Sequence, residues 1–164
     1  MMIIIECNND KQLMFRLGFT KTNIVHAGSK GIVLERLNGE TKPAIGIVDE
    51  DDVKKLQRLL KDNDIDLVIK KGKKNSIALT AKRNDKTKSL IVISPRLEEW
   101  IYKVAKRNGI NPTKYDLPED PDMLHNDTSK ESEKGFRDLL VVLNKKKDWE
   151  IELMRKWIKE AMQQ

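Results

Sequence analysis

The stretch Pro43–Asp52, PAIGIVDEDD, decides how the rest of the chain is interpreted. Ala44–Val48 is an apolar run too short for a core helix, which is typical of a buried, parallel strand. Acidic residues follow it at once, and VKKLQRLLKD then has the pattern of a helix. Because ligands bind at the carboxyl ends of strands in open α/β sheets, this order predicts a site there. The alternative is that Asp51 or Asp52 caps the helix.

Apolar runs and helical patterns alternate on both sides of that stretch. The first strand is expected at Met2–Ile5 and the second at Thr22–His26, and Asn9 or Asp10 is expected to cap the helix between them. This alternation predicts an α/β fold with a mainly parallel sheet flanked by helices. The later elements are expected to be β-prone pieces at Asp66–Ile69 and Ser76–Ala81 that form a β-hairpin insertion, a buried strand at Ser89–Ile93, and helices at Arg96–Asn108, Lys134–Leu143 and Trp149–Met162.

Length and composition limit the class of protein. A chain of 164 residues fits one domain. We divide it into an α/β core at 1–110, an irregular loop at 111–133 rich in proline and acidic residues, and C-terminal helices at 134–164 packed on the core. The single cysteine, Cys7, excludes an internal disulfide and a Cys-based zinc cluster. No apolar run has membrane-spanning length and the first residues lack signal-peptide features, so we expect a cytoplasmic, soluble protein.

Acidic residues at strand ends are the feature that points to chemistry. Glu6 closes the first strand, Asp49 and Asp51 close the third, and Glu98 begins the helix after Ser89–Ile93. If these strands are neighbours, their carboxylates converge at one sheet edge, where their mutual repulsion favours a divalent cation. Residues two apart on an extended segment point the same way, so Asp49 and Asp51 could share one ion. A glutamate opposite them could be a further ligand or move a proton.

These residues give the first two-thirds of the chain a resemblance to the TOPRIM domain, in particular that of OLD-family nucleases. The family has a strand ending in Glu, usually followed by Gly, and then an Asp four residues on. The segment IIIE-CNN-D resembles it through Glu6 and Asp10, with Cys7 in place of the glycine. The family's Asp-x-Asp after the third strand is matched by Asp49 and Asp51 in GIVDED.

Two further segments extend the resemblance. AGSKG, which contains Lys30, loosely matches the glycine-bearing loop that follows the family's second strand. SPRLEEWI resembles the segment R-x-I-E-N-Y/W-L of OLD-like members, with Glu98 at the acidic position and Trp100 at the aromatic one. Pro95 stands where that segment has its arginine, and Arg96 comes one place later.

The resemblance implies a TOPRIM-like (Rossmann-like) fold and a function. It implies Mg²⁺ or Mn²⁺ held by Asp49, Asp51 and Glu6, with catalytic roles for Glu6, Asp10 and Glu98 in phosphodiester cleavage or transfer on nucleic acid. One alternative is a non-catalytic module that keeps the TOPRIM fold and binds nucleic acid or protein. Another is a receiver-like signalling domain, which we rank last because Glu6 stands alone after the first strand.

Basic residues cluster on two predicted loops. If these loops form one hairpin, they present a cationic surface to the phosphates of DNA or RNA. A net charge of +6 permits such binding. The alternative is a solvated, lysine-rich β edge that deters aggregation. The candidate nucleic-acid-binding residues are Lys30, Lys70, Lys71, Lys73, Lys74, Lys82 and Arg83.

The remaining candidates have both a functional and a structural interpretation. His26 ends a strand and His125 lies in the acidic loop, and each is either a ligand or a structural residue. Cys7 is expected to be a small buried residue, since no base partner for a nucleophile is identifiable. The apolar stripe of the last helix fits the chain's own sheet or another subunit, so a homo-oligomer or a protein partner is possible.

Overall fold

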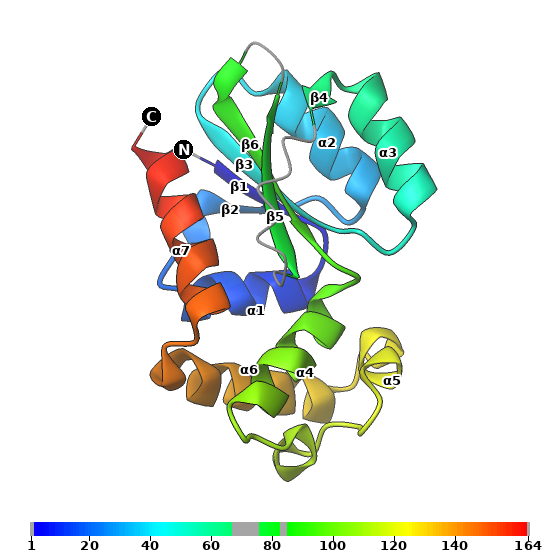
Figure 1. The fold of residues 1–164 in the computed structure, drawn as a ribbon, viewed down its shortest axis with the longest axis vertical. Helices are drawn as coiled ribbons and strands as arrows, with labels where there is room; N and C mark the ends of the chain where they lie inside the picture. Colours follow the sequence, from blue (N-terminus) through cyan, green and yellow to red (C-terminus); the bar gives the residue numbers. More distant parts are fainter. Residues whose placement is uncertain (1, 67–75, 83–84, 164) are drawn as a thin grey trace.

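The computed structural model describes residues 2–66, 76–82 and 85–163 of the chain. Its centre is a six-stranded sheet in the order β2-β1-β3-β6-β5-β4, with helices on both faces (Figure 1). The prediction of an α/β fold with a mainly parallel sheet is therefore confirmed. The strands are β1 (Met2–Ile5), β2 (Ile24–His26), β3 (Ala44–Asp49), β4 (Ile65–Asp66), β5 (Ile77–Lys82) and β6 (Asp85–Ile93).

The parallel half of the sheet brings distant segments to one edge. β1 pairs in parallel with β2 and β3, and β3 pairs in parallel with β6. These strands therefore end at the same edge. β5 and β4 continue the sheet in antiparallel pairs beyond β6. The expected hairpin insertion is thus an extension of the central sheet, because β6 begins earlier than predicted and pairs with β5 along its length.

Helices cover the sheet unequally. α2 and α3 pack on one face, whereas α1, α4, α6 and α7 pack on the other (Figure 1). The helices are α1 (Asn8–Arg16), α2 (Lys30–Gly39), α3 (Val53–Asp62), α4 (Leu97–Arg107), α5 (Pro121–Asn126), α6 (Lys130–Lys146) and α7 (Trp149–Met162), with short 3₁₀ turns η1 (Lys21–Asn23) and η2 (Pro112–Tyr115).

β3 is buried along its whole length because both faces of the sheet are covered there. Ile45 and Ile47 join the core beneath α1, α4, α6 and α7, whereas Val48 joins the core beneath α2 and α3. Gly46 lies between them, and a Cβ atom there would come within 2.8 Å of a methyl carbon of Leu90. The same Cβ atom would lie 3.1 Å from a methyl carbon of Val33 in α2. A glycine at this position therefore lets α2 pack closely on the sheet.

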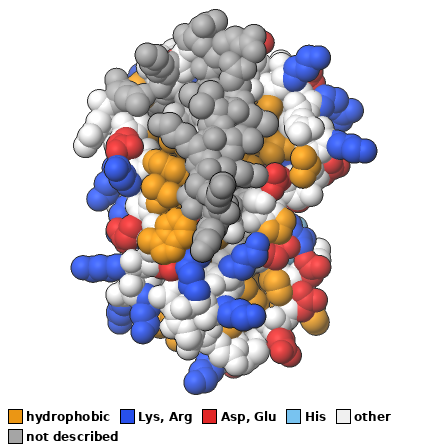
Figure 2. All heavy atoms as spheres, viewed as in Figure 1, with side chains coloured by type: hydrophobic (Ala, Val, Ile, Leu, Met, Phe, Trp, Pro, Cys, Tyr) orange, Lys and Arg blue, Asp and Glu red, His pale blue; other side chains and the backbone are white. Residues whose placement is uncertain are grey.

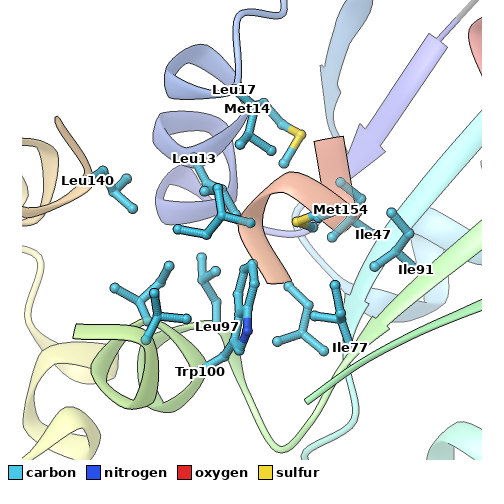
Figure 3. Close-up of a cluster of buried hydrophobic side chains, with 14 of the residues drawn as sticks. Leu13, Met14, Leu17, Ile47, Ile77, Ile91, Leu97, Trp100, Leu140 and Met154 are labelled. Carbon is cyan, nitrogen blue, oxygen red and sulfur yellow. The ribbon is translucent and has the colours of Figure 1, made fainter. Parts of the chain in front are cut away.

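The larger core is built around Trp100 of α4, which is fully buried. Figure 3 shows it between Leu97 of the same helix and Ile77 of β5. Met154 of α7 reaches the strand residues Ile47 and Ile91 in the same view. The C-terminal helices therefore complete the main core and pack on the chain's own sheet.

The prediction of an irregular loop at 111–133 is wrong. The segment contains η2 and α5, and α6 begins at Lys130. Its prolines misled the prediction because Pro112 and Pro121 occupy the first turns of these elements, where a missing N–H has no cost. Asn111 and Asp120 supply the caps, each accepting a hydrogen bond from a backbone N–H two residues on.

Two smaller predictions also differ from the structure. The second strand begins at Ile24, since the preceding residues form η1. α1 is preceded by Cys7, so Asn9 and Asp10 lie inside its first turn and not at its cap. Of the β-prone piece Asp66–Ile69, only Asp66 falls within the described residues.

Candidate acidic site at the carboxyl edge of the sheet

The carboxyl ends of β1 and β3 carry the predicted acidic residues. Glu6 follows β1 directly, and Asp49 is the last residue of β3. After β3 the backbone stays attached to the neighbouring strand, because the N–H of Glu50 donates to the carbonyl of Ile93 at 2.7 Å. The N–H of Asp51 then donates to the carbonyl of Pro95 at 2.8 Å. The edge is therefore held by backbone contacts between segments far apart in the sequence.

Asp49 is buried, with 9% of its surface exposed. One of its oxygens, Oδ1, accepts a hydrogen bond of 3.0 Å from the backbone N–H of Leu97, in the first turn of α4. The pKa of Asp49 is raised to about 9, mainly by burial and also by the nearby carboxylates of Asp10, Glu6 and Glu98, against the effect of the Leu97 bond. This raised pKa favours the protonated form of Asp49.

Glu6 receives a backbone hydrogen bond from Asp49, but one of its two oxygens has no described partner. Its Oε1 is buried and has no hydrogen-bond partner in the described part of the chain. Burial raises the pKa of Glu6 to about 7, although the charge of Lys30 acts in the opposite direction. An unpartnered buried oxygen is costly, so this position calls for a ligand or a functional explanation.

Lys30 is a buried cation at this edge. It is the first residue of α2 and only 6% exposed, and its Nζ forms an ion pair with Oδ1 of Asp51. Burial alone would raise the pKa of Asp51, but the hydrogen bond from Lys30 lowers it. Asp49 and Asp51 therefore have opposite environments. The strand alternation that was expected to align them ends at Asp49, so Asp51 points to a different partner.

The capping alternative holds for Asp52. Its Oδ1 accepts a hydrogen bond of 2.9 Å from the backbone N–H of Lys55, and it is the N-cap of α3. The acidic run at the end of β3 therefore contains a buried residue with a raised pKa, Asp49, an ion-paired residue, Asp51, and a helix cap, Asp52. The sequence pattern alone does not separate these roles.

Asp10 holds the turn that follows β1. Its Oδ2 accepts hydrogen bonds from the backbone N–H groups of Glu6 at 3.1 Å and Cys7 at 2.9 Å. Burial raises the pKa of Asp10 to about 6, and the hydrogen bonds from Cys7 partly offset that effect. The predicted catalytic Asp10 therefore fixes the backbone that presents Glu6.

Glu98 is buried in the first turn of α4, with a side-chain exposure of 2%. Its Oε1 accepts a hydrogen bond of 2.8 Å from Nδ2 of Asn9. Its Oε2 lies 3.2 Å from Nδ1 of His125, in α5. The contact between Glu98 and His125 could not be predicted from the sequence, because His125 was expected to lie in an irregular loop at 111–133.

A cavity of about 350 Å³ opens beside these residues. It lies between the end of β1, the end of β2 and the segment that joins α5 to α6. Glu6 and Glu98 line it, together with both histidines, His26 and His125. A ligand in this cavity would therefore meet carboxylates and imidazoles together.

The carboxylates match a hard divalent ion in type, and the unpartnered oxygen of Glu6 fits a missing cation. Their arrangement is not a finished ligand set. Within residues 2–66, 76–82 and 85–163 no group of three or more His, Cys, Asp or Glu is placed to hold a metal ion. Asp51 in particular is already neutralised by Lys30. An ion coordinated by Glu6, Asp49 and Asp51 would have to replace that ammonium.

Most of the predicted basic surface lies outside the described residues. This applies to Lys70, Lys71, Lys73, Lys74 and Arg83, and to the side chain of Lys82. Lys30 belongs to the acidic edge and not to that surface. Figure 2 shows other Lys and Arg side chains spread among acidic ones over one face of the molecule.

No known protein family, curated protein or solved structure matches the chain. The resemblance to TOPRIM domains therefore stays a prediction, and the candidate site stands on its geometry. None of the helices among the described residues is long and apolar enough to cross a membrane.

Proposed function

We propose that the protein cleaves or transfers phosphodiester bonds in DNA or RNA, in the manner of a TOPRIM domain, with Mg²⁺ or Mn²⁺ at the acidic edge of its sheet. The observation that carries this proposal is the buried, unpartnered Oε1 of Glu6 beside the buried Asp49, whose pKa is raised. Carboxyl groups with pKa values displaced in this way are a common property of functional sites.

Glu6 and Asp49 would hold the ion. Asp51 would become a third ligand if its ion pair with Lys30 opened and the metal ion took the place of the ammonium. A bound divalent ion would supply Lewis-acid stabilisation of charge on the phosphate. Its positive charge would also offset the burial and the neighbouring carboxylates that raise the pKa values of Glu6 and Asp49, so loading should release protons. Lys30, freed from Asp51, would be available to a phosphate oxygen of the nucleic acid. Asp10 would keep its place in the turn that presents Glu6.

A second candidate is a non-catalytic module that binds nucleic acid or a protein partner. The Lys30–Asp51 ion pair favours it, because that carboxylate already has a cation. The N–H of Leu97 likewise already supports Asp49. In this function the acidic edge is structural, and the predicted lysine-rich loops carry the binding.

Calorimetric titration with MgCl₂ and MnCl₂, alone and with a short oligonucleotide, tests the proposal. We expect the wild-type protein to bind ion with proton release, and Glu6→Gln and Asp49→Asn to weaken binding about 10-fold or more, since each removes a charged oxygen ligand. Glu160→Gln is the matched control, because Glu160 lies on the exposed face of α7 and pairs with Lys156.

Cleavage of single- and double-stranded DNA and RNA is measured with the same variants. Ion binding and cleavage that are both lost in Asp49→Asn would support the proposal. A wild-type protein that neither binds ion, with or without oligonucleotide, nor cleaves any substrate would overturn it. Oligonucleotide binding without cleavage would then identify the non-catalytic module, with an affinity that falls steeply as salt is added.

A further inference from the structure

We infer that His125 is the proton acceptor of this site, oriented by Glu98 and Asn9. This inference rests on the proposed function and adds a residue to it. The sequence placed His125 in a loop with no defined partner. The structure places it on α5, at the acidic cavity, in contact with a buried carboxylate.

The hydrogen bonds of Glu98 determine which nitrogen of His125 is available. Oε1 of Glu98 is occupied by the amide of Asn9 at 2.8 Å, so the other oxygen, Oε2, faces Nδ1 of His125 at 3.2 Å. A carboxylate can only accept, so Nδ1 carries the proton. In the neutral imidazole Nε2 then has a free electron pair and can accept a proton.

α5 is fixed to α4, so this orientation does not depend on a freely moving loop. Leu124, the residue before His125, is buried in the main core. Asp122 forms an ion pair with Arg96, which also binds Glu99 at 2.6 Å. Glu98 contacts one side of the imidazole, and 40% of the His125 side chain remains exposed to solvent. It can therefore meet a ligand without further rearrangement of the fold.

Other polar residues line the same cavity as the imidazole of His125. Two of them, Ser129 and Ser132, already form hydrogen bonds at the start of α6. Ser129 caps the helix, and the hydroxyl of Ser132 donates to Asp127. Burial raises the pKa of the Cys7 thiol, so it stays protonated and is no rival proton acceptor. The titratable groups that face the cavity with His125 are Glu6 from the end of β1, Cys7 before α1, His26 from β2, Glu98 from α4, Asp127 before α6 and Glu133 from α6.

In the proposed hydrolysis, one proton passes from water to His125. A water oxygen forms a bond to the phosphorus as the bond between phosphorus and the leaving oxygen breaks. The water gives a proton to Nε2 of His125, and the leaving oxygen takes a proton from solvent. The imidazolium formed is stabilised by Glu98, and it later returns its proton to solvent. Glu98 and Asn9 are thus positioning residues, since they act through His125.

The first experiment measures the tautomer of His125 by ¹⁵N NMR in the metal-free protein. The chain has two histidines, so His26→Gln and His125→Gln assign both imidazoles without ambiguity. We expect the neutral imidazole of His125 to be protonated at Nδ1, and Glu98→Gln to reduce that preference. A dominant Nε2–H form of His125 in the wild-type protein would overturn the inference, whatever the protein cleaves.

The second experiment measures cleavage against pH. We expect His125→Ala to lower kcat about 100-fold or more with KM nearly unchanged, to remove the acidic limb of the profile, and to be partly rescued by added imidazole. Met123→Ala, at an exposed position of the same helix, is the matched control for a disturbance of α5. If the wild-type protein cleaves and His125→Ala cleaves equally well, this inference alone fails. If the wild-type protein cleaves nothing, the proposed function fails and takes the inference with it.

Discussion

Among the described residues, two groups of buried or half-buried carboxylates differ in how well they are paired. At the carboxyl edge of the sheet, Glu6 and Asp49 have their pKa values raised to about 7 and about 9. Where α4 meets α7, Asp148 is buried too, yet its pKa is lowered. Burial alone would raise the pKa of Asp148, so its hydrogen bonds from Arg107 and Asn108 outweigh the loss of solvent.

The second group, the Arg107 cluster, consists of Arg107, Asn108, Trp100, Asp148 and Glu150. Arg107 donates from Nε to Asp148 at 2.7 Å and from Nη1 to Glu150 at 2.6 Å. Glu150 has no exposed surface and also accepts a hydrogen bond from the indole of Trp100 at 3.2 Å. Each carboxylate in this group has several donors, so the cluster joins α4 to α7 as a structural connection.

The comparison shows that burial alone does not identify a functional carboxylate. The carboxylates of the Arg107 cluster have several donors, whereas at the acidic edge Glu6 has an oxygen without a described partner and Asp49 has a raised pKa. At the acidic edge the ion pair of Lys30 goes to Asp51. Three changes test how far this contrast extends.

The largest expected effect comes from Arg107→Ala. It leaves Glu150 buried without its cation, so we expect the free energy of unfolding to fall by about 3–5 kcal/mol. Urea unfolding followed by tryptophan fluorescence measures it. Lys156→Ala is the control, since it removes only the exposed pair with Glu160, and we expect less than about 0.5 kcal/mol there. Equal effects of the two variants would show that the Arg107 cluster is not a structural connection.

Asp49→Asn should have a smaller effect, of the opposite sign. The native state holds the Asp49 proton from its ordinary pKa of 3.8 up to about 9, so wild-type stability falls as pH rises through that range. Asparagine resembles the protonated acid and still accepts from Leu97. We expect the variant to be more stable than wild type by about 1 kcal/mol or more at pH 8.5, with little difference at pH 4.

Urea unfolding of both proteins at pH 4 and pH 8.5 checks this prediction. The expected signature is a gain that grows with pH. A variant destabilised by the same amount at both pH values would mean that Asp49 is ionised in the native protein, and the contrast with the Arg107 cluster would disappear.

Glu6→Gln should give the smallest change, because Lys30 partly offsets the burial of Glu6. The contribution of the Glu6 proton to stability is complete below pH 4.5 and is lost as pH rises through about 7. The variant should therefore flatten the wild-type curve of stability against pH between these values and leave the part above pH 7 unchanged. Thermal unfolding at half-unit pH steps measures it. A curve that keeps the wild-type slope would show that another group titrates there.

Much of the fold was predictable because it depends on local pattern. β1 and α7 have the predicted limits, since an unbroken β-branched run and a strong helical stripe leave few alternatives. The helical content of 111–133 was missed because proline and acidic residues mark both loops and first helical turns. At the site, Glu6, Asp49 and Glu98 were identified from their positions at strand and helix ends. Their partners were not.

The sequence by itself determined the α/β class, the parallel strands and the acidic residues at their ends, because these follow from the period and length of apolar runs. Only the tertiary structure decided which partner each acid receives. Lys30 reaches Asp51, His125 reaches Glu98, and Arg107 reaches Glu150, all across separate elements. Such pairs depend on how helices pack on the sheet. The same packing excludes the water that would otherwise give the carboxyl groups similar pKa values.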